Sequence, residues 1–192
     1  VGQALKREGH AVWSNDLMAY AHVLATCYVQ ADAGVWKDKA ERLIAELAQA
    51  PARDGWFTEA YCRQARYFHP DNGARIEGVR EQIAALSLEP ELEAIALTSL
   101  MEAADRVDST AGVQMAYMKA WAPRAMKPLA LRLPELTPGV GRATRADAVQ
   151  IAPMIEADLV YLDPPYNQHS YLGNYHVWET LTLWDRPETY GV

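Results

Sequence analysis

The chain has 192 residues, half of them hydrophobic, with a formal net charge of −7 and two cysteines. This length predicts one domain, or one sheet domain with a sizeable insertion, with enough apolar residues for a buried core. The acidic balance counts against nucleic-acid binding, no apolar run could span a membrane, and no signal peptide is visible, so we expect a cytoplasmic protein. Cys27 and Cys62 are isolated, form no metal-binding spacing and suit a reducing compartment.

The first elements predict half of a Rossmann-like βαβ unit. A helix over residues 1–8 ends at Gly9, and a short strand over residues 11–13 leads to Asp16. In such folds the acid that closes the second strand commonly accepts hydrogen bonds from a ribose. The alternative is that Asp16 caps a helix that begins at Leu17. The chain begins without methionine inside a helical pattern and ends just after another, so we expect a fragment of a longer chain.

Nearly everything from Leu17 to about Val107 is predicted to be helical, over residues 17–29, 35–50, 71–86 and from Pro90 onward. One face of the last helix carries apolar residues at helical spacing: Leu92, Ile95, Ala96, Leu100 and Ala103. Roughly ninety helical residues are too many for a simple crossover between two strands. The economical interpretation is an inserted helical subdomain.

The segment from Gly112 to Arg145 is basic and irregular. It holds six Lys or Arg residues and one acid, Glu135, which gives a local net charge of +5, together with Tyr117 and Trp121. A basic, aromatic segment in an acidic protein predicts a phosphate-facing surface. A solvated loop with scattered cations explains the composition equally well.

Two further strands are expected. Residues 143–146 predict a short strand that ends at Asp147, followed by a short helix to about Pro153. Leu159 to Leu162 is a continuous apolar run, typical of a strand covered on both faces. Pro164 and Pro165 must end that strand because neither donates an N–H group. A helix is predicted over residues 174–184, packed against the sheet.

The turn from Asp163 to Tyr166 carries the chemistry. In an open α/β sheet, ligands bind just past the carboxyl ends of the strands. The Asp163 carboxylate and the Pro164 carbonyl could together accept both hydrogens of one exocyclic amine, while Tyr166 stacks on the ring that bears it. This arrangement suits an enzyme that takes a base out of a duplex and transfers a methyl group to it from a sulfonium donor. Neither a metal nor a covalent nucleophile is needed.

At this point the chain resembles the D12 class of adenine-specific DNA methyltransferases. The main carrier of the resemblance is the run from Asp158 through Asp163-Pro-Pro-Tyr166 to Tyr175. Weaker carriers are Ser14-Asn-Asp16, Tyr67-Phe68 with residues 72–76, residues 110–112 with 117–119, and residues 145–148. The resemblance implies an α/β fold in which a partial Rossmann-like methyltransferase sheet (residues 1–16 and 145–192) carries an inserted, mainly helical target-recognition subdomain (residues 17–144).

The resemblance also implies roles for residues. The catalytic motif is Asp163, Pro164, Pro165 and Tyr166. S-adenosylmethionine would be held at the ribose by Asp16 and at the adenine by Asp147, with Asp163 bordering it. Candidate contacts to DNA are Lys119, Arg124 and Lys127. The glycine-rich turn of the family has no counterpart within residues 1–192, so we expect the fragment to be inactive alone.

The expected substrate is double-stranded DNA, methylated at the N6 amine of adenine, and a cognate restriction endonuclease is a candidate partner. Related turns occur in enzymes that methylate cytosine N4, RNA adenine or protein glutamine, although an aspartate at the first turn position favours adenine in DNA. Two further alternatives stay open: a non-catalytic helical nucleic-acid-binding module, and an α/β domain of another role.

Overall fold

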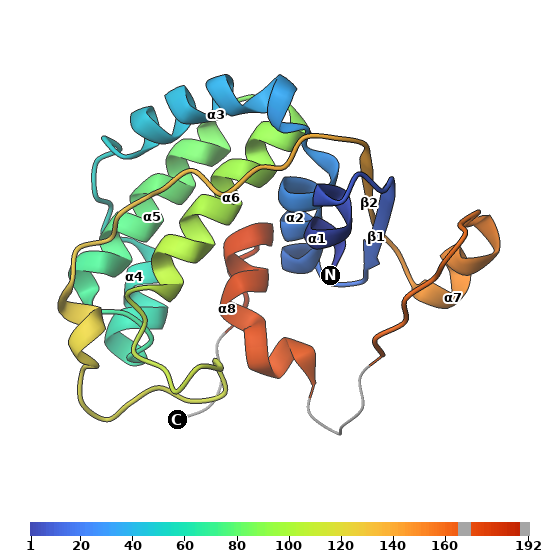
Figure 1. The fold of residues 1–192 in the computed structure, drawn as a ribbon. Helices are drawn as coiled ribbons and strands as arrows, with labels where there is room; N and C mark the ends of the chain where they lie inside the picture. Colours follow the sequence, from blue (N-terminus) through green and yellow to red (C-terminus); the bar gives the residue numbers. More distant parts are fainter. Residues whose placement is uncertain (165–169, 189–192) are drawn as a thin grey trace.

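A computed structural model describes residues 1–164 and 170–188. Its elements follow one another as shown in Figure 1. The first half contains α1 (Gly2–Arg7), β1 (Val12–Asp16), α2 (Ala19–Ala25), the π-helix η1 (Thr26–Gln30), α3 (Ala33–Leu47), α4 (Trp56–Thr58), the π-helix η2 (Glu59–Gln64), α5 (Pro70–Ala85) and α6 (Pro90–Asp105). The second half contains the 3-10 helix η3 (Pro123–Met126), β2 (Gly141–Arg145), α7 (Ala148–Ile151), the 3-10 helix η4 (Ala152–Met154) and α8 (Tyr171–Leu183).

The described residues form one small parallel sheet of two strands. β1 pairs with β2 from Val12 opposite Gly141 to Asp16 opposite Arg145. β2 passes so close to η1 that its first residue, Gly141, must be a glycine. A Cβ atom at this position would lie only 1.9 Å from the Val29 carbonyl oxygen. Both short strands predicted around these residues are confirmed. A mixed helix and strand architecture with a parallel sheet fits the α/β class, and its Rossmann-like details stay a prediction.

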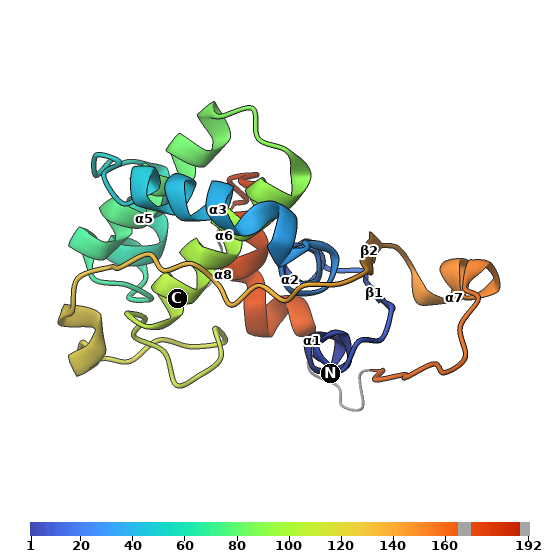
Figure 2. The same ribbon diagram turned by 45° about the horizontal axis from the view of Figure 1, so that its top comes forward.

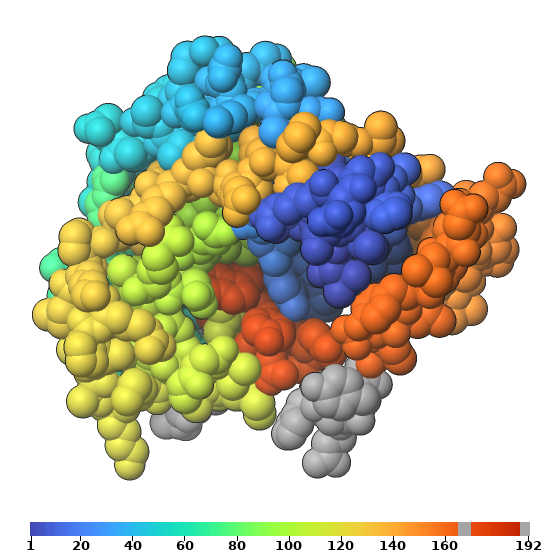
Figure 3. All heavy atoms as spheres, in the orientation of Figure 1, coloured from blue at the N-terminus to red at the C-terminus, as the bar shows by residue number. Residues whose placement is uncertain are grey.

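The helices α3, α5 and α6 form a helical body beside this sheet (Figures 1 and 2). All five apolar residues predicted to share one face of α6 are buried, at 0–6% exposure: Leu92, Ile95, Ala96, Leu100 and Ala103. α8 joins the same core through Val177 and Leu181, which are both fully buried. Figure 3 shows α8 between the α6 side and the α2 side of the molecule, with residues after η3 crossing the helical body.

The helical region differs from the prediction in two places. The helix expected over residues 17–29 is divided into α2 and the π-helix η1, where the Thr26 hydroxyl donates to the His22 carbonyl at 2.9 Å. The α4–η2 segment was not predicted. Its first turn depends on the buried Glu77 of α5, whose carboxylate accepts from the amides of Gly55, Phe57 and Thr58 at 2.9–3.1 Å. No local sequence pattern reveals a cap supplied from so far along the chain.

The predicted buried strand over Leu159–Leu162 is wrong in this structure. These four residues lie in no strand and are 59–81% exposed. A strand forms only where a neighbour offers a hydrogen-bonding edge, and in the described part of the chain β1 and β2 pair with each other and not with this segment. The segment follows α7 and η4, which stand away from the helical body in Figures 1 and 2.

The division into a sheet domain and a helical insertion stays a prediction. Helix α2 contacts β1 and β2 as well as α6 and α8, so the helices and the sheet share contacts. Among residues 1–164 and 170–188, no helix combines the length and apolar character needed to cross a bilayer. Within the same ranges, no three His, Cys, Asp or Glu side chains gather closely enough to hold a metal ion.

Candidate active site

The carboxyl ends of β1 and β2 form the centre of the candidate site. The strands are parallel and Asp16 lies opposite Arg145, so Asp16 and the nearby Asp147 follow adjacent strand ends. The pairing extends one step further, because the Ala146 amide donates to the Asp16 carbonyl at 3.2 Å. Both acids are exposed at this edge. The structure therefore brings together the two residues that were predicted to hold the cofactor.

Asp16 shapes the turn that leads from β1 into α2. Its Oδ1 accepts from the Met18 amide at 2.8 Å, and Met18 occupies the N-cap position of α2. An aspartate that accepts from the amide two residues on forms a compact turn. The carboxylate thus has a local structural contact of the kind that the capping alternative anticipates. A ribose contact stays a prediction.

Asp147 is the N-cap residue of α7. Its Oδ1 accepts from the amides of Val149 at 2.8 Å and Gln150 at 3.3 Å, and these contacts satisfy N–H groups that have no partner inside the helix. This acid therefore has a structural role as a helix cap. The predicted contact with the cofactor adenine would use the exposed part of the same carboxylate.

Glu179 of α8 is a site residue that sequence reasoning missed. It lies 8% exposed, and its two carboxylate oxygens each accept one amide from the first turn of α2: Ala19 to Oε1 and Tyr20 to Oε2, both at 3.0 Å. A buried carboxylate suits a helix N-terminus, which has unpaired N–H groups and a partial positive charge. An acid inside an amphipathic helix is ordinarily assigned to the solvent face, so the sequence contained no signal for this contact.

Arg145 ties the same elements together from β2. Its guanidinium lies 3.6 Å from Glu179 Oε1, and its Nε donates to the Leu17 carbonyl at 3.1 Å. The residue after β1, the last residue of β2 and a buried acid of α8 are thus linked by named contacts. This linkage fixes the strand ends relative to α8, the helix that follows the Asp163–Tyr166 turn in sequence.

Three tyrosines lie beside the strand ends. The Tyr175 ring centroid is 5.5 Å from that of Tyr20 and 6.2 Å from that of Tyr171. Burial raises the pKa of the Tyr20 phenol, and the nearby carboxylates of Asp16 and Glu179 raise it further. The neutral phenol of Tyr20 offers a hydrogen-bond donor. Together these rings provide apolar faces and polar ends next to the two acids.

The structure places the predicted catalytic motif only in part. Asp163 and Pro164 are exposed and belong to no helix or strand, whereas Pro165 and Tyr166 lie outside the described residues. Asp163 and Pro164 are thus accessible and are not covered by packed side chains. Because the preceding strand does not form, the grouping of Asp163 with Asp16 and Asp147 at one sheet edge stays a prediction.

The three candidate DNA contacts differ in their surroundings. Arg124 donates through Nε to the buried Asp108 at 2.6 Å and through a terminal nitrogen to the Thr110 carbonyl at 2.7 Å. Its guanidinium therefore closes the base of the loop from residue 108 to 124. The side chains of Lys119 and Lys127 are exposed, while the Lys127 carbonyl accepts from the side-chain Nδ2 of Asn72 at 2.8 Å. Their backbone is held and their ammonium groups face solvent.

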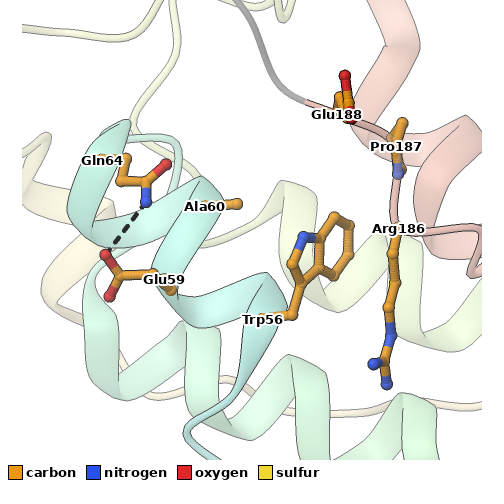
Figure 4. Close-up of a pocket in the computed structure, with 7 residues that line it drawn as sticks. All are labelled: Trp56, Glu59, Ala60, Gln64, Arg186, Pro187 and Glu188. Carbon is orange, nitrogen blue, oxygen red and sulfur yellow. Dashed lines mark hydrogen bonds between the residues drawn. The ribbon is translucent and has the colours of Figure 1, made fainter.

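A pocket of about 380 Å³ lies elsewhere in the structure (Figure 4). Its lining is drawn from α4, η2 and the chain after α8: Trp56, Glu59, Ala60, Gln64, Arg186, Pro187 and Glu188. Figure 4 shows Gln64 turned toward Glu59, to which it donates at 3.3 Å, rather than across the pocket. This lining contains none of the predicted site residues, so the pocket is separate from the strand-end site.

Comparisons with known proteins agree with the motif. The family model of the D12 class N6 adenine-specific DNA methyltransferases matches residues 1–192. The chain is 34% identical to the type II methyltransferase M.NlaIII of Neisseria lactamica, over 96% of this chain and 58% of that protein. It is 36% identical to M.FokI of Planomicrobium okeanokoites over 65% of this chain and 20% of that protein.

A third relative is the type II methyltransferase M.CviAII of Paramecium bursaria Chlorella virus 1, which is 30% identical over 91% of this chain and 55% of its own length. The chain thus spans little more than half of M.NlaIII and M.CviAII. No solved structure matches it. Because the family model covers the whole sequence, the chain belongs to the D12 class of N6 adenine-specific DNA methyltransferases.

Proposed function

We propose that this chain is part of an S-adenosylmethionine-dependent enzyme that methylates the N6 amine of a flipped-out adenine in double-stranded DNA. The observation that carries the proposal is the Asp163-Pro-Pro-Tyr166 motif in a chain that belongs to this family. The exposure of Asp163 and Pro164 supports it, because both acceptors must reach a base that has left its duplex.

The residues at the strand ends fit the cofactor in their chemistry. Two exposed carboxylates, Asp16 and Asp147, would accept hydrogen bonds from a ribose hydroxyl and from an adenine amine. The tyrosine rings beside them offer faces for a flat group. S-adenosylmethionine, when bound, supplies an electrophilic methyl group. No metal is needed for this chemistry.

The motif would act on the target amine through alignment. The Asp163 carboxylate and the Pro164 carbonyl would each accept one amine hydrogen, which directs the nitrogen lone pair away from them and toward the donor. The same two acceptors favour the positive charge that develops on the nitrogen as it reacts. Tyr166 would stack on the adenine and hold its plane. Lys119, Lys127 and Arg124 would lie on the DNA-facing side, with Arg124 also supporting the loop.

The test is methyl transfer by the full-length protein. Unmethylated double-stranded DNA is incubated with labelled S-adenosylmethionine, and the DNA is then digested and its nucleosides are separated. The proposal expects label in N6-methyladenine. Label in N4-methylcytosine, RNA or protein glutamine would move the assignment to a related amino-methyltransferase.

The Asp163→Ala variant tests the role of the motif. We expect methylation to fall by at least about 10²-fold while DNA binding is kept, because a preorganised acceptor of the amine is lost. Asp158→Ala, an exposed acid on the same segment, is the matched control and should keep normal activity. Loss of DNA binding in Asp163→Ala, with no methylation measurable in the wild type, would favour a nucleic-acid-binding module.

The isolated fragment of residues 1–192 is expected to be inactive, because its sequence has no counterpart of the glycine-rich cofactor turn of the family. Calorimetry on the fragment tests this expectation directly. Micromolar binding of S-adenosylmethionine would contradict it.

A further inference from the structure

Helix α8 is broken near its start. Tyr175 has φ −135° and ψ 24°, which are not helical values, and the break separates the turn of Tyr171–Asn174 from the rest of the helix. In an unbroken α-helix the Val177 amide would donate to the carbonyl of Gly173. The turn before the break begins five residues after Tyr166 in sequence, and it carries Tyr171, one of the tyrosines beside the strand ends.

Gln114 fills this break from a distant loop. Its backbone amide donates to the Asn174 carbonyl at 2.8 Å, and its side-chain Oε1 accepts from the Val177 amide at 2.8 Å. One residue thus bonds to the helix on both sides of Tyr175. Gln114 is 3% exposed, so these contacts are made away from water.

The loop that carries Gln114 is itself held firmly. Its two sides are joined by an antiparallel bridge between Thr110 and Tyr117, and the Tyr67 hydroxyl donates to the Gln114 carbonyl at 3.0 Å. The contact of Arg124 with the buried Asp108 closes the base of the loop. These contacts join the two sides of the loop to each other and to Tyr67.

The same loop leads directly to the basic segment. Lys119 follows Tyr117 by two residues, and its carbonyl accepts a hydrogen bond from Arg66. A displacement of this segment would reach α8 through Gln114, since that residue makes the two bonds across the break. Exposed neighbours such as Met115, at 58% exposure, provide no comparable route.

We propose that Gln114 is a positioning residue that couples DNA contact at the basic segment to the first turn of α8, and through that turn to the tyrosines beside the strand ends. The inference rests on the proposed function. DNA seated on the segment around Lys119 sets the loop, and the loop fixes the break in α8 through Gln114. Gln114 thus controls the position of the first turn of α8, which carries Tyr171.

The first experiment is hydrogen exchange on the full-length wild-type protein, with and without unmethylated plasmid DNA. If the coupling exists, DNA should slow amide exchange in peptides that cover residues 171–183. These peptides include the Val177 amide, which donates a hydrogen bond to Gln114. Unchanged exchange in these peptides, under conditions where the DNA is bound, would overturn the proposal. This measurement needs no variant, so a folding defect does not affect it.

The second experiment compares Gln114→Met with Met115→Gln in methyl-transfer kinetics. Methionine keeps the length of glutamine and removes the acceptor of the Val177 amide, so we expect kcat to fall about tenfold, the equivalent of one lost hydrogen bond. KM for DNA should change less than about twofold, because the basic segment is intact. Met115→Gln should behave as the wild type.

The result separates the two proposals. A wild-type enzyme that does not methylate DNA contradicts the proposed function, while the exchange measurement still tests the coupling through bound DNA. A wild-type enzyme that methylates DNA, with a Gln114→Met variant of unchanged kcat, overturns the coupling alone. Equal losses of kcat in Gln114→Met and Met115→Gln would also overturn it, because they would indicate a general disturbance of the loop.

Discussion

Most of the large apolar side chains of the helical body are buried, whereas those of residues 159–162, in the segment of residues 155–164, are exposed to solvent. Leu100 of α6 is completely buried, whereas Leu162, the residue before Asp163, is 77% exposed. A helix satisfies its hydrogen bonds internally and needs only one covered face, but a strand needs an edge supplied by another strand. The segment with the most specific chemical signal therefore depends most on neighbours for its structure.

The largest expected effect comes from making the same substitution, leucine to alanine, once in the helical body and once in the exposed segment. Leu100→Ala should lower the free energy of unfolding of residues 1–192 by about 2–5 kcal/mol, because it opens a cavity in the core of α6. Leu162→Ala should change it by less than about 0.5 kcal/mol, because an exposed side chain makes few packing contacts. Urea denaturation measures both. A large loss of unfolding free energy in Leu162→Ala would mean that the segment packs against the rest of the protein, which would contradict the contrast.

A smaller effect is expected at Glu179, where the helical body meets the strand ends. Glu179→Gln keeps the size of the side chain but removes its charge and one of its two acceptors for the α2 amides. We expect the free energy of unfolding to fall by about 1–2 kcal/mol. Glu156→Gln, in the exposed segment, is the matched control and should have no measurable effect. Equal values for the two variants would show that the α2 cap has no energetic role.

The pH dependence of stability sharpens the same comparison. Burial lowers the pKa of His176 on α8, and burial together with Arg145 lowers that of His22 on α2. A histidine whose folded pKa lies below its unfolded value of about 6.5 binds protons more readily in the unfolded chain. Its contribution to stability is thus complete above that value and declines as the pH falls below it.

This expectation is checked with urea denaturation at pH 7.5, 6.5 and 5.5. The wild type should lose stability as the pH falls, and His176→Gln should show a smaller loss over the same interval. A steeper loss in the variant would assign the pH dependence to other groups. The exposed segment contributes no histidine among its described residues.

The smallest expected effect concerns DNA affinity in the full-length protein. Lys119→Gln should reduce the slope of log affinity against log salt by about one, as expected when one phosphate contact is removed. The Lys119→Gln variant should have the stability of the wild type, because the Lys119 side chain is exposed. Arg124→Gln should also lower stability, because the buried Asp108 loses its cation. Filter binding over a salt series, with parallel thermal melts, separates the two residues.

Sequence reasoning succeeded where local patterns decide the structure. The apolar face of α6, the glycine that ends the first helical run and the two strands that close near Asp16 and Arg145 were all predicted, because each follows from spacing or from a turn residue. Gly9 has φ +88°, a backbone conformation that favours glycine.

Several of the failures share one cause, which is dependence on distant residues. The α4–η2 segment needs the carboxylate of Glu77, the first turn of α2 needs Glu179, and the break in α8 needs Gln114. None of these partners is near its target in sequence. The predicted strand before Asp163 failed for the same reason, because apolar residues identify a strand but do not supply the edge it must join. The motif, in contrast, was recognised from residue types alone.

The pairing of β1 with β2 has a consequence for how the chain folds. The Trp13 indole donates to the Thr144 hydroxyl across 131 positions of sequence, so we expect the two strands to meet only after the helices between them have brought their ends together. Helices that form from neighbouring residues have no such delay. Substitutions in the strand pair should therefore act chiefly on the rate at which the native protein opens, and substitutions in α6 should act on the rate at which it assembles.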